Sequence, residues 1–131
     1  MDNYCLKWGE FESNIRESFI ELRKENNLFD VTLATEDGHQ VEAHQVILSA
    51  GSKFFSDIFK KTKHQSPFIY LKGIRRVELE KIVDFLYKGE AYVSHEEINK
   101  FLEAAQDLQV NGLKSPKGEE TIKAKSEVEQ T

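Results

Sequence analysis

Cysteine is almost absent from this chain of 131 residues. Cys5 is the only one, so no disulfide can form within the chain, and we expect a reducing compartment, cytosol or nucleus. Long apolar runs are absent too, because runs such as residues 46–48 are far shorter than the about 20 residues that cross a bilayer. The first residues lack the basic start and apolar stretch of a secretory signal, so we expect neither export nor membrane insertion.

An excess of positive charge is also absent. The chain has 18 lysines and arginines against 23 aspartates and glutamates, a formal net charge of −5 at pH 7. A domain that binds nucleic acid by itself usually presents a basic surface that neutralises phosphates. The two small basic clusters, at residues 60–63 and 75–76, are not interleaved with aromatic side chains, and we interpret them as solvated. We therefore expect no direct nucleic-acid binding by this chain.

Motifs for catalysis and metal binding are missing. The chain has no G-x-S-x-G, Walker or G-x-G-x-x-G sequence, so we expect no enzymatic activity, cofactor or small-molecule substrate. Cys5 and the four histidines do not have the spacing of metal ligands, which are usually paired as C-x-x-C or H-x-x-x-H. We expect Cys5 to be a packing residue, and His44 to form hydrogen bonds within the fold where a strand meets a helix.

Residues 29–43 have the pattern of a β-hairpin. Val31 and Leu33 alternate with polar or small residues, and the alternation resumes at residues 41–43. Between the two runs, Asp37 and Gly38 predict a two-residue turn with positive φ angles. The segment thus predicts a half-buried pair of antiparallel strands.

Two short helices should follow directly, at residues 44–51 and 52–59. We expect Gly51 to end the first in a left-handed conformation and Ser52 to cap the second. The second carries three phenylalanines that we assign to the core: Phe54, Phe55 and Phe59. This run builds a scaffold and places no reactive group, so function should be sought in binding.

The amino-terminal segment combines a short apolar strand with an amphipathic helix. Residues 4–8 alternate, and a helix with one apolar stripe should follow from residue 11 to residue 22. The strand has no neighbour in sequence with which to pair, so it must pair either with a distant strand of its own chain or with another chain. We predict an oligomer interface formed by five of these residues: Leu6, Trp8, Phe11, Ile15 and Phe19.

The second half predicts one more strand and two more helices. A strand at residues 68–71 is followed by a helix that Gly89 ends, and Ser94 with Glu97 predicts a capping box for a last helix. From Lys114 the chain is polar with mixed charge, so we expect residues 114–131 to be a disordered tail or linker after a single domain at residues 1–113. The fold class is α+β, a short sheet with a cluster of about five to six helices.

Several stretches in this order resemble the BTB/POZ domain family: FDVTL, VEAHQVILSAGSKFFSDIF, VDFLYKGE and FLEAAQDLQV. The resemblance covers roughly residues 4–113. The Cys5-Leu6-Lys7-Trp8 start, the GEAYVS segment and the LQVNGL end are similar to the insect Tramtrack-type group of that family.

The resemblance implies a protein–protein interaction domain of a nuclear transcription or chromatin regulator. It also implies a BTB/POZ fold with a short three-stranded sheet and an additional amino-terminal strand exchanged within a homodimer. Members of the Tramtrack-type group assemble further and pair with relatives, so the expected partners are a second copy of the chain, related BTB proteins and corepressors. DNA contact would lie outside this chain, and the mechanism would be avidity.

The chain departs from the family pattern at several positions. Gly9 and Glu10 replace two asparagines of the group, and Gly51 and Lys53 replace a cysteine and a proline. In corepressor-binding relatives, an aspartate that matches Asp30 and a basic residue form a charged pocket, but Gln45 stands at the basic position. The pocket then keeps a negative charge without its counter-ion, which argues against corepressor binding in that mode.

Two other roles share the broader fold. One is a substrate adaptor of a cullin-type ubiquitin ligase, in which a further helical region usually follows the domain. The polar sequence from Lys114 onward argues against this role. The other is a tetramerisation domain of the potassium-channel type, in which the amino-terminal CLKW strand is not expected.

Overall fold

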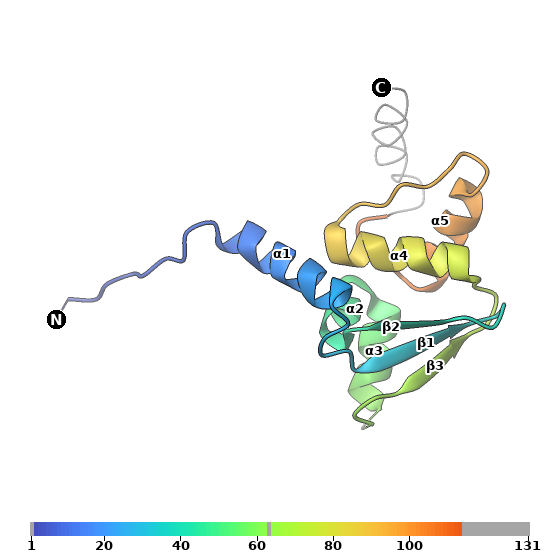
Figure 1. The fold of residues 1–131 in the computed structure, drawn as a ribbon, viewed down its shortest axis with the longest axis horizontal. Helices are drawn as coiled ribbons and strands as arrows, with labels where there is room; N and C mark the ends of the chain where they lie inside the picture. The colour runs from blue at the N-terminus through green and yellow to red at the C-terminus, as the bar shows by residue number, and fades with distance from the viewer. Residues whose placement is uncertain (1, 63, 114–131) are drawn as a thin grey trace.

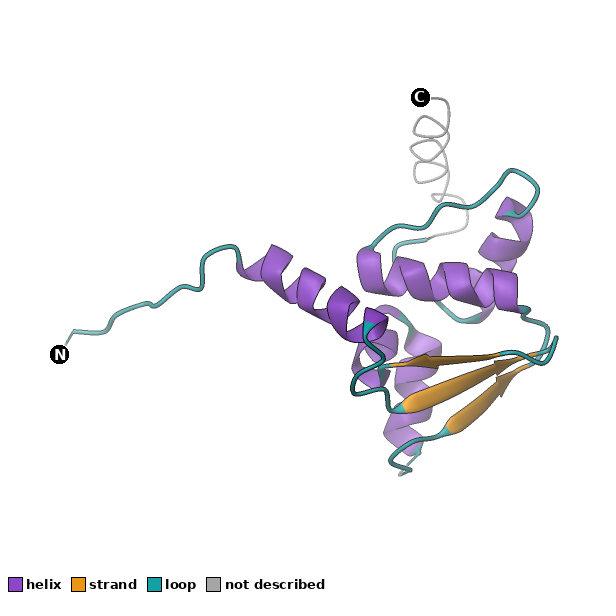
Figure 2. Ribbon diagram, in the orientation of Figure 1, coloured by secondary structure: helices purple, strands orange, loops and turns teal. Residues whose placement is uncertain are grey.

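The computed structural model describes residues 2–62 and 64–113. This part of the chain forms five helices and a small three-stranded sheet, which confirms the predicted α+β class (Figures 1 and 2). The predicted tail at residues 114–131 lies outside the described residues. In chain order the elements are α1 (Phe11–Lys24), β1 (Val31–Thr35), β2 (Gln40–Ala43), α2 (Gln45–Gly51), α3 (Lys53–Lys61), β3 (Phe68–Leu71), α4 (Arg76–Lys88) and α5 (Ile98–Asp107).

The sheet has the strand order β2-β1-β3. β1 pairs with β2 in antiparallel register and with β3 in parallel register, because α2 and α3 return the chain to the start of the sheet before β3 begins. In the view of Figure 1, α2 and α3 lie behind the sheet and α4 lies above it. Both β2 and β3 are therefore edge strands.

The core lies between the sheet and the helices. Leu33, Leu48 and Phe55 are completely buried together with Leu79 and Ile82, so every layer contributes to one cluster. The alternation at residues 31–33 and the helical spacing of α4 thus point their apolar side chains to a common interior. As predicted, the phenylalanines of α3 belong to this core, Phe55 fully and its two neighbours in part.

The hairpin loop is longer than the predicted two-residue turn. Gly38 alone has a positive φ, of 82°, while Asp37 does not. Gly38 N–H donates to the Thr35 carbonyl over 3.1 Å, and Thr35 N–H donates to the His39 carbonyl over 2.8 Å. This pattern is typical of a three-residue loop with a left-handed glycine at its end.

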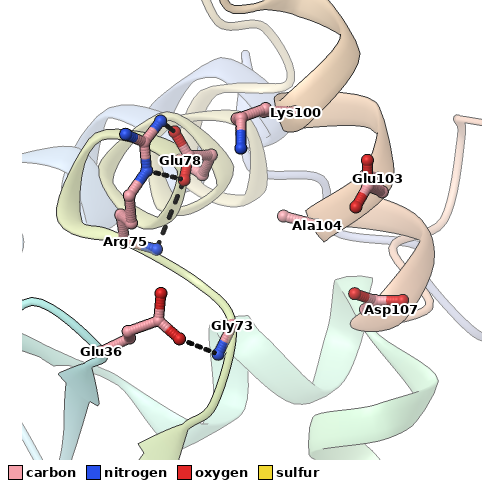
Figure 3. Close-up of a pocket in the computed structure, with 8 residues that line it drawn as sticks. All are labelled: Glu36, Gly73, Arg75, Glu78, Lys100, Glu103, Ala104 and Asp107. Carbon is pink, nitrogen blue, oxygen red and sulfur yellow. Dashed lines mark hydrogen bonds and ion pairs between the residues drawn. The ribbon is translucent and has the colours of Figure 1, made fainter.

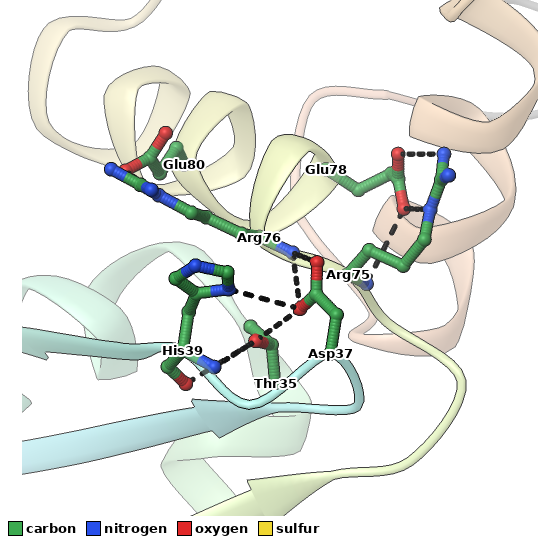
Figure 4. Close-up of polar contacts among 7 residues, drawn as sticks. All are labelled: Thr35, Asp37, His39, Arg75, Arg76, Glu78 and Glu80. Carbon is green, nitrogen blue, oxygen red and sulfur yellow. Dashed lines mark hydrogen bonds and ion pairs between the residues drawn. The ribbon is translucent and has the colours of Figure 1, made fainter.

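Asp37 of the hairpin loop also contacts the first residue of α4. Its carboxylate accepts hydrogen bonds from Thr35 Oγ1 at 2.6 Å and from the backbone N–H of Arg76 at 3.1 Å (Figure 4). Arg76 is the first residue of α4. The Thr35 hydrogen bond, and to a lesser extent that of Arg76, holds the pKa of Asp37 below its ordinary value. The hairpin loop thereby fixes the start of α4.

The junction of α2 and α3 differs in one respect from the prediction. Gly51 lies within the last turn of α2 and is not left-handed. A side chain at this position would overlap Leu86 of α4, so glycine allows the close approach of two helices. Ser52 behaves as predicted: its Oγ accepts from Phe55 N–H at 3.1 Å and also donates to the Leu108 carbonyl at 2.6 Å.

The predicted capping box at the last helix does not form. α5 begins at Ile98, and Ser94 Oγ donates to the Glu97 carboxylate at 3.1 Å instead of accepting from a backbone N–H. A capping carboxylate occurs instead at α4, where buried Glu78 accepts from the Arg75 backbone N–H and pairs with its guanidinium at 2.8 Å. This second pair lacks the Ser/Thr signature on which the sequence motif depends.

Candidate oligomerisation interface

The predicted strand at residues 4–8 is not formed within the chain. This segment has no regular secondary structure and extends away from the body of the molecule (Figure 1). Tyr4 and Leu6 are 85% and 93% exposed, and Cys5 is exposed rather than packed. The sequence leaves two alternatives for this segment, pairing with a strand of its own chain or with another chain. The first alternative is wrong for the described residues, because residues 4–8 form no strand there.

An aromatic pair joins this segment to α1. The rings of Trp8 and Phe11 meet edge to face with their centroids 5.1 Å apart. Trp8 remains 57% exposed and Phe11 51% exposed, and Phe11 lines a shallow hollow beside the first turn of α1. Leu6, two residues before Trp8, is 93% exposed, and we call these three exposed apolar residues the amino-terminal patch (Leu6, Trp8 and Phe11).

The remaining predicted interface residues lie further along α1. No residue of α1 is fully buried: Ile15 is half-buried, and Phe19 is half-buried against the core. Polar contacts attach the helix to α4, because Arg16 donates to the Lys88 carbonyl at 3.0 Å and Arg23 pairs with Asp84 at 2.8 Å. Of the five predicted interface residues, three are thus more than half exposed: Leu6, Trp8 and Phe11. Phe19 packs against the core, and Ile15 is half-buried.

A second segment without regular secondary structure follows α4 at residues 90–94. Its side chains alternate, with Ala91 and Val93 buried and Tyr92 57% exposed between them. Residues 90–93 make no backbone hydrogen bond in the described part of the chain. No strand is predicted here from the sequence, although buried and exposed side chains alternate between Gly89 and Ser94 as they do in a strand.

Asp30 and Gln45, the two positions of the predicted charged pocket, are hydrogen-bonded to each other. Gln45 N–H donates to Asp30 Oδ1 at 2.7 Å, and Gln45 Nε2 donates to the Asp30 carbonyl at 2.9 Å. Gln45 is the first residue of α2, so the carboxylate lies at the positive end of a helix dipole. The helix terminus therefore compensates the charge of Asp30 where a basic side chain is missing.

His44 has the structural role predicted for it. The residue is buried, its Nε2 donates to the Asn27 carbonyl at 2.7 Å, and its Nδ1 accepts from the Tyr87 hydroxyl. Burial raises the pKa of Tyr87, which keeps its hydroxyl protonated as this hydrogen bond requires. The network joins the loop after α1 to α2 and α4.

One small cavity of about 70 Å³ lies between α4, α5 and the hairpin loop (Figure 3). Its lining is largely charged, with Glu103 and Asp107 of α5 facing Arg75 and Glu36 across the opening. Arg75 is already paired with Glu78, and Glu36 accepts from Gly73 N–H at 3.1 Å. The cavity has room for a few water molecules, whereas pockets for organic ligands usually measure about 300–1,000 Å³.

The described part of the chain contains neither a cluster of metal ligands nor a membrane-spanning helix. Within residues 2–62 and 64–113, no three or more histidine, cysteine, aspartate or glutamate side chains gather in a way that could hold a metal ion. None of the helices there is long and apolar enough to span a membrane.

Comparison with known families agrees with this architecture. The family model of the BTB/POZ domain matches residues 19–125, and the chain therefore belongs to the BTB/POZ family. The BTB domain of zebrafish PATZ1 has a similar fold, with a TM-score of 0.72, 21% identity and coverage of 98% of this chain and all of that one. This family is not enzymatic, which confirms the expectation that the chain is not an enzyme.

Curated relatives place the chain more closely, and all three named here are from Drosophila melanogaster. The chain is 44% identical to the sex determination protein fruitless and 34% identical to the alpha isoform of protein tramtrack, and each match covers 84% of this chain. It spans only 11% and 13% of those two proteins. It is also 40% identical to longitudinals lacking protein-like, over 84% of this chain and 86% of that one. The predicted Tramtrack-type resemblance is thus confirmed.

Proposed function

We propose that this domain is an oligomerisation module of a nuclear transcription or chromatin regulator, which joins copies of itself or of related BTB proteins. The observation that carries the proposal is the amino-terminal patch. Three large apolar side chains, each more than half exposed, fall within six residues at the start of a helix that has no fully buried residue, and two of them, Trp8 and Phe11, are in contact. Apolar surface of this kind is typical of an interface with another protein, and a tryptophan is among the residues that most often dominate binding energy.

The exchange of a strand between two copies would provide backbone hydrogen-bond partners for the amino-terminal segment and for the segment after α4. Residues 4–8 of one copy alternate in the same way as residues 90–94, and the backbone groups of residues 4–8 and 90–93 lack partners in the described chain. Pairing residues 4–8 with residues 90–94 of a second copy would turn both into strands. A two-fold axis would repeat the contact, so that neither copy retains the free segment.

The nuclear role rests on the relatives. Since the chain spans about a tenth of fruitless and tramtrack, a domain of this type there accompanies a much longer polypeptide. An oligomeric domain would bring several such polypeptides together and increase their occupancy of clustered sites through avidity. The acidic charge of the chain fits a role in which other regions contact DNA.

Light scattering coupled to size-exclusion chromatography tests the proposal on the full chain. The Trp8→Ala, Phe11→Ala double variant should have a mass at least two-fold below that of the unchanged protein, because it removes the aromatic centre of the patch. Both side chains are more than half exposed, so the circular dichroism spectrum should retain the helical content of the wild type. Val77→Ala, an exposed apolar residue on α4, is the matched control and should leave the mass unchanged.

An unchanged mass in the double variant would refute the interface. Stoichiometric binding of a cullin by the full chain would favour the ubiquitin-ligase adaptor role instead. Nuclear localisation is tested separately, by imaging the tagged full-length protein in cells. A cytoplasmic signal under all conditions would contradict the proposed setting.

A further inference from the structure

The amino-terminal segment and the segment after α4 each carry a single charged residue. Lys7 is the only charged residue among residues 4–8, and Glu90 is the only one among residues 90–94. Both side chains are exposed. Lys7 has no hydrogen-bond or ion-pair partner in the described residues, and Glu90 accepts only from the Tyr92 hydroxyl, at 3.3 Å. Two opposite charges, one on each segment, are therefore left without a counter-charge.

Alternation would place both charges on the same face of a ribbon formed by the two segments. Side chains that lie opposite each other in paired strands point to one face. Ala91 and Val93 are buried, so Leu6, which is also apolar, should share their face. Lys7 follows Leu6 directly and therefore lies on the other face, which is the one that exposes Glu90.

The free backbone after α4 is limited to residues 90–93, because the backbone at both ends is already bonded. On one side, Gly89 N–H donates to the Phe85 carbonyl at 2.8 Å. On the other side, the Ser94 carbonyl accepts from Glu97 N–H at 3.1 Å. A strand that pairs here therefore gains its backbone hydrogen bonds along residues 90–93.

We infer that Lys7 of one copy forms an ion pair with Glu90 of a second copy across an antiparallel ribbon, and that this pair selects which chains associate. The inference rests on the strand exchange proposed above. In antiparallel orientation, residues 4–7 match residues 90–93 one for one, which sets Lys7 opposite Glu90. A two-fold axis repeats the ion pair. Opposite charges then favour a matched partner, and like charges disfavour a mismatched one.

A parallel ribbon would not bring the same charges together. If Lys7 lay opposite Glu90 in parallel orientation, residues 4–6 would run along residues 87–89, which are the end of α4 and its cap. The N–H groups there are already bonded within the helix. Charge complementarity therefore selects the antiparallel orientation.

Charge exchange between two full chains tests the ion pair. Lys7→Glu and Glu90→Lys should each weaken self-association about tenfold, because two pairs of like charges then meet. A chain with both substitutions restores opposite charges and should associate as the unchanged chain does. When the two single variants are mixed, the heterodimer has two favourable pairs and should account for more than about 80% of dimers. Co-expression with different tags, followed by native mass spectrometry, measures this proportion.

Lys24→Glu is the matched control, since Lys24 is exposed and has no ion-pair partner in the described residues. Mixed with Glu90→Lys, it should give heterodimers only at the proportion expected by chance, because Lys24 lies at the far end of α1 from Lys7. The preference of the two charge variants for each other should also disappear in about 1 M sodium chloride, which screens exposed charges.

Cys5 provides an independent measure of the register. It is exposed, and it lies opposite Tyr92 when Lys7 lies opposite Glu90. Tyr92→Cys should therefore form a disulfide with the native Cys5 of a second chain in oxidised glutathione, since facing cysteines on paired strands come within disulfide reach. Cys5→Ser in the same chain should abolish this link. Absence of the disulfide in the Tyr92→Cys chain would exclude the register.

The inference is wrong if the two charge variants mix at the proportion expected by chance, or if the chain with both substitutions associates no better than either single variant. Neither result would contradict the proposed oligomerisation module, which the Trp8→Ala, Phe11→Ala variant tests by its mass. An unchanged mass in that alanine variant would instead refute the module itself.

Discussion

His44 shows how a single residue organises the centre of this domain. Its backbone N–H donates to the Tyr87 hydroxyl at 3.0 Å, and its ring accepts from the same hydroxyl. The other ring nitrogen donates to the Asn27 carbonyl, so every polar atom of the buried imidazole has a partner. A fully satisfied buried network of this kind fixes the loop that carries α1 relative to α4.

Tyr87→Phe should therefore destabilise the domain by about 1–3 kcal/mol, because it leaves two buried groups of His44 without their partner. Urea denaturation followed by circular dichroism measures the loss. Tyr92→Phe is the matched control: its hydroxyl is exposed and bonded only to Glu90, so the change should stay within about 0.5 kcal/mol. Equal losses in the two variants would show that the buried network contributes nothing specific.

Helix capping is the interaction that local sequence predicts well at one helix and poorly at another. Ser52 caps α3 because the adjacent helix α2 ends immediately before it, which holds its backbone extended as a cap requires. Ser94 precedes a turn at residues 95–97 and is too far from the first residue of α5 to cap it. The same residue type is thus structural in one place and dispensable in the other.

Ser52→Ala should cost about 1–2 kcal/mol, since it removes the cap of α3 and leaves the buried Leu108 carbonyl without its hydroxyl donor. Ser94→Ala should change the free energy of unfolding by less than about 0.5 kcal/mol, because that hydroxyl is exposed and bonded only to Glu97. Thermal and urea denaturation of both variants make the comparison. A large loss in Ser94→Ala would mean that its capping box forms in solution.

The domain exposes several large apolar side chains although it has a well-formed core. Trp8 and Phe11 of the amino-terminal patch are 57% and 51% exposed. If this patch is covered only on assembly, folding and association are linked, and the stability of the protein depends on its concentration.

The melting temperature of the unchanged protein should accordingly rise by about 2–4 °C for each tenfold increase in protein concentration. Differential scanning calorimetry over two orders of magnitude in concentration measures this dependence. The Trp8→Ala, Phe11→Ala variant should show a weaker dependence, because it removes the aromatic residues of the amino-terminal patch. A melting temperature of the unchanged protein that does not vary with concentration would contradict association through this patch.

The sequence by itself determined the elements and their order, because each depends on neighbouring residues. Alternation predicted β1 and β2, the spacing of apolar residues predicted α1 and α4, and Gly89 marked the end of α4 with a φ of 80°. It also identified the apolar amino-terminal segment as one that needs a partner outside its own neighbourhood.

Only the tertiary structure decided how distant residues serve one another. Asp37 lies in a hairpin loop but accepts a hydrogen bond from the first residue of α4. At Gly51, a larger side chain would overlap Leu86 of another helix. The backbone groups of residues 90–93 are unpaired in the described chain, and β3 is an edge strand, only because of where the sheet ends. Periodicity within a segment records which side of it is buried, but not which element buries it. Which apolar side chains of the described residues stay exposed therefore depends on the tertiary structure.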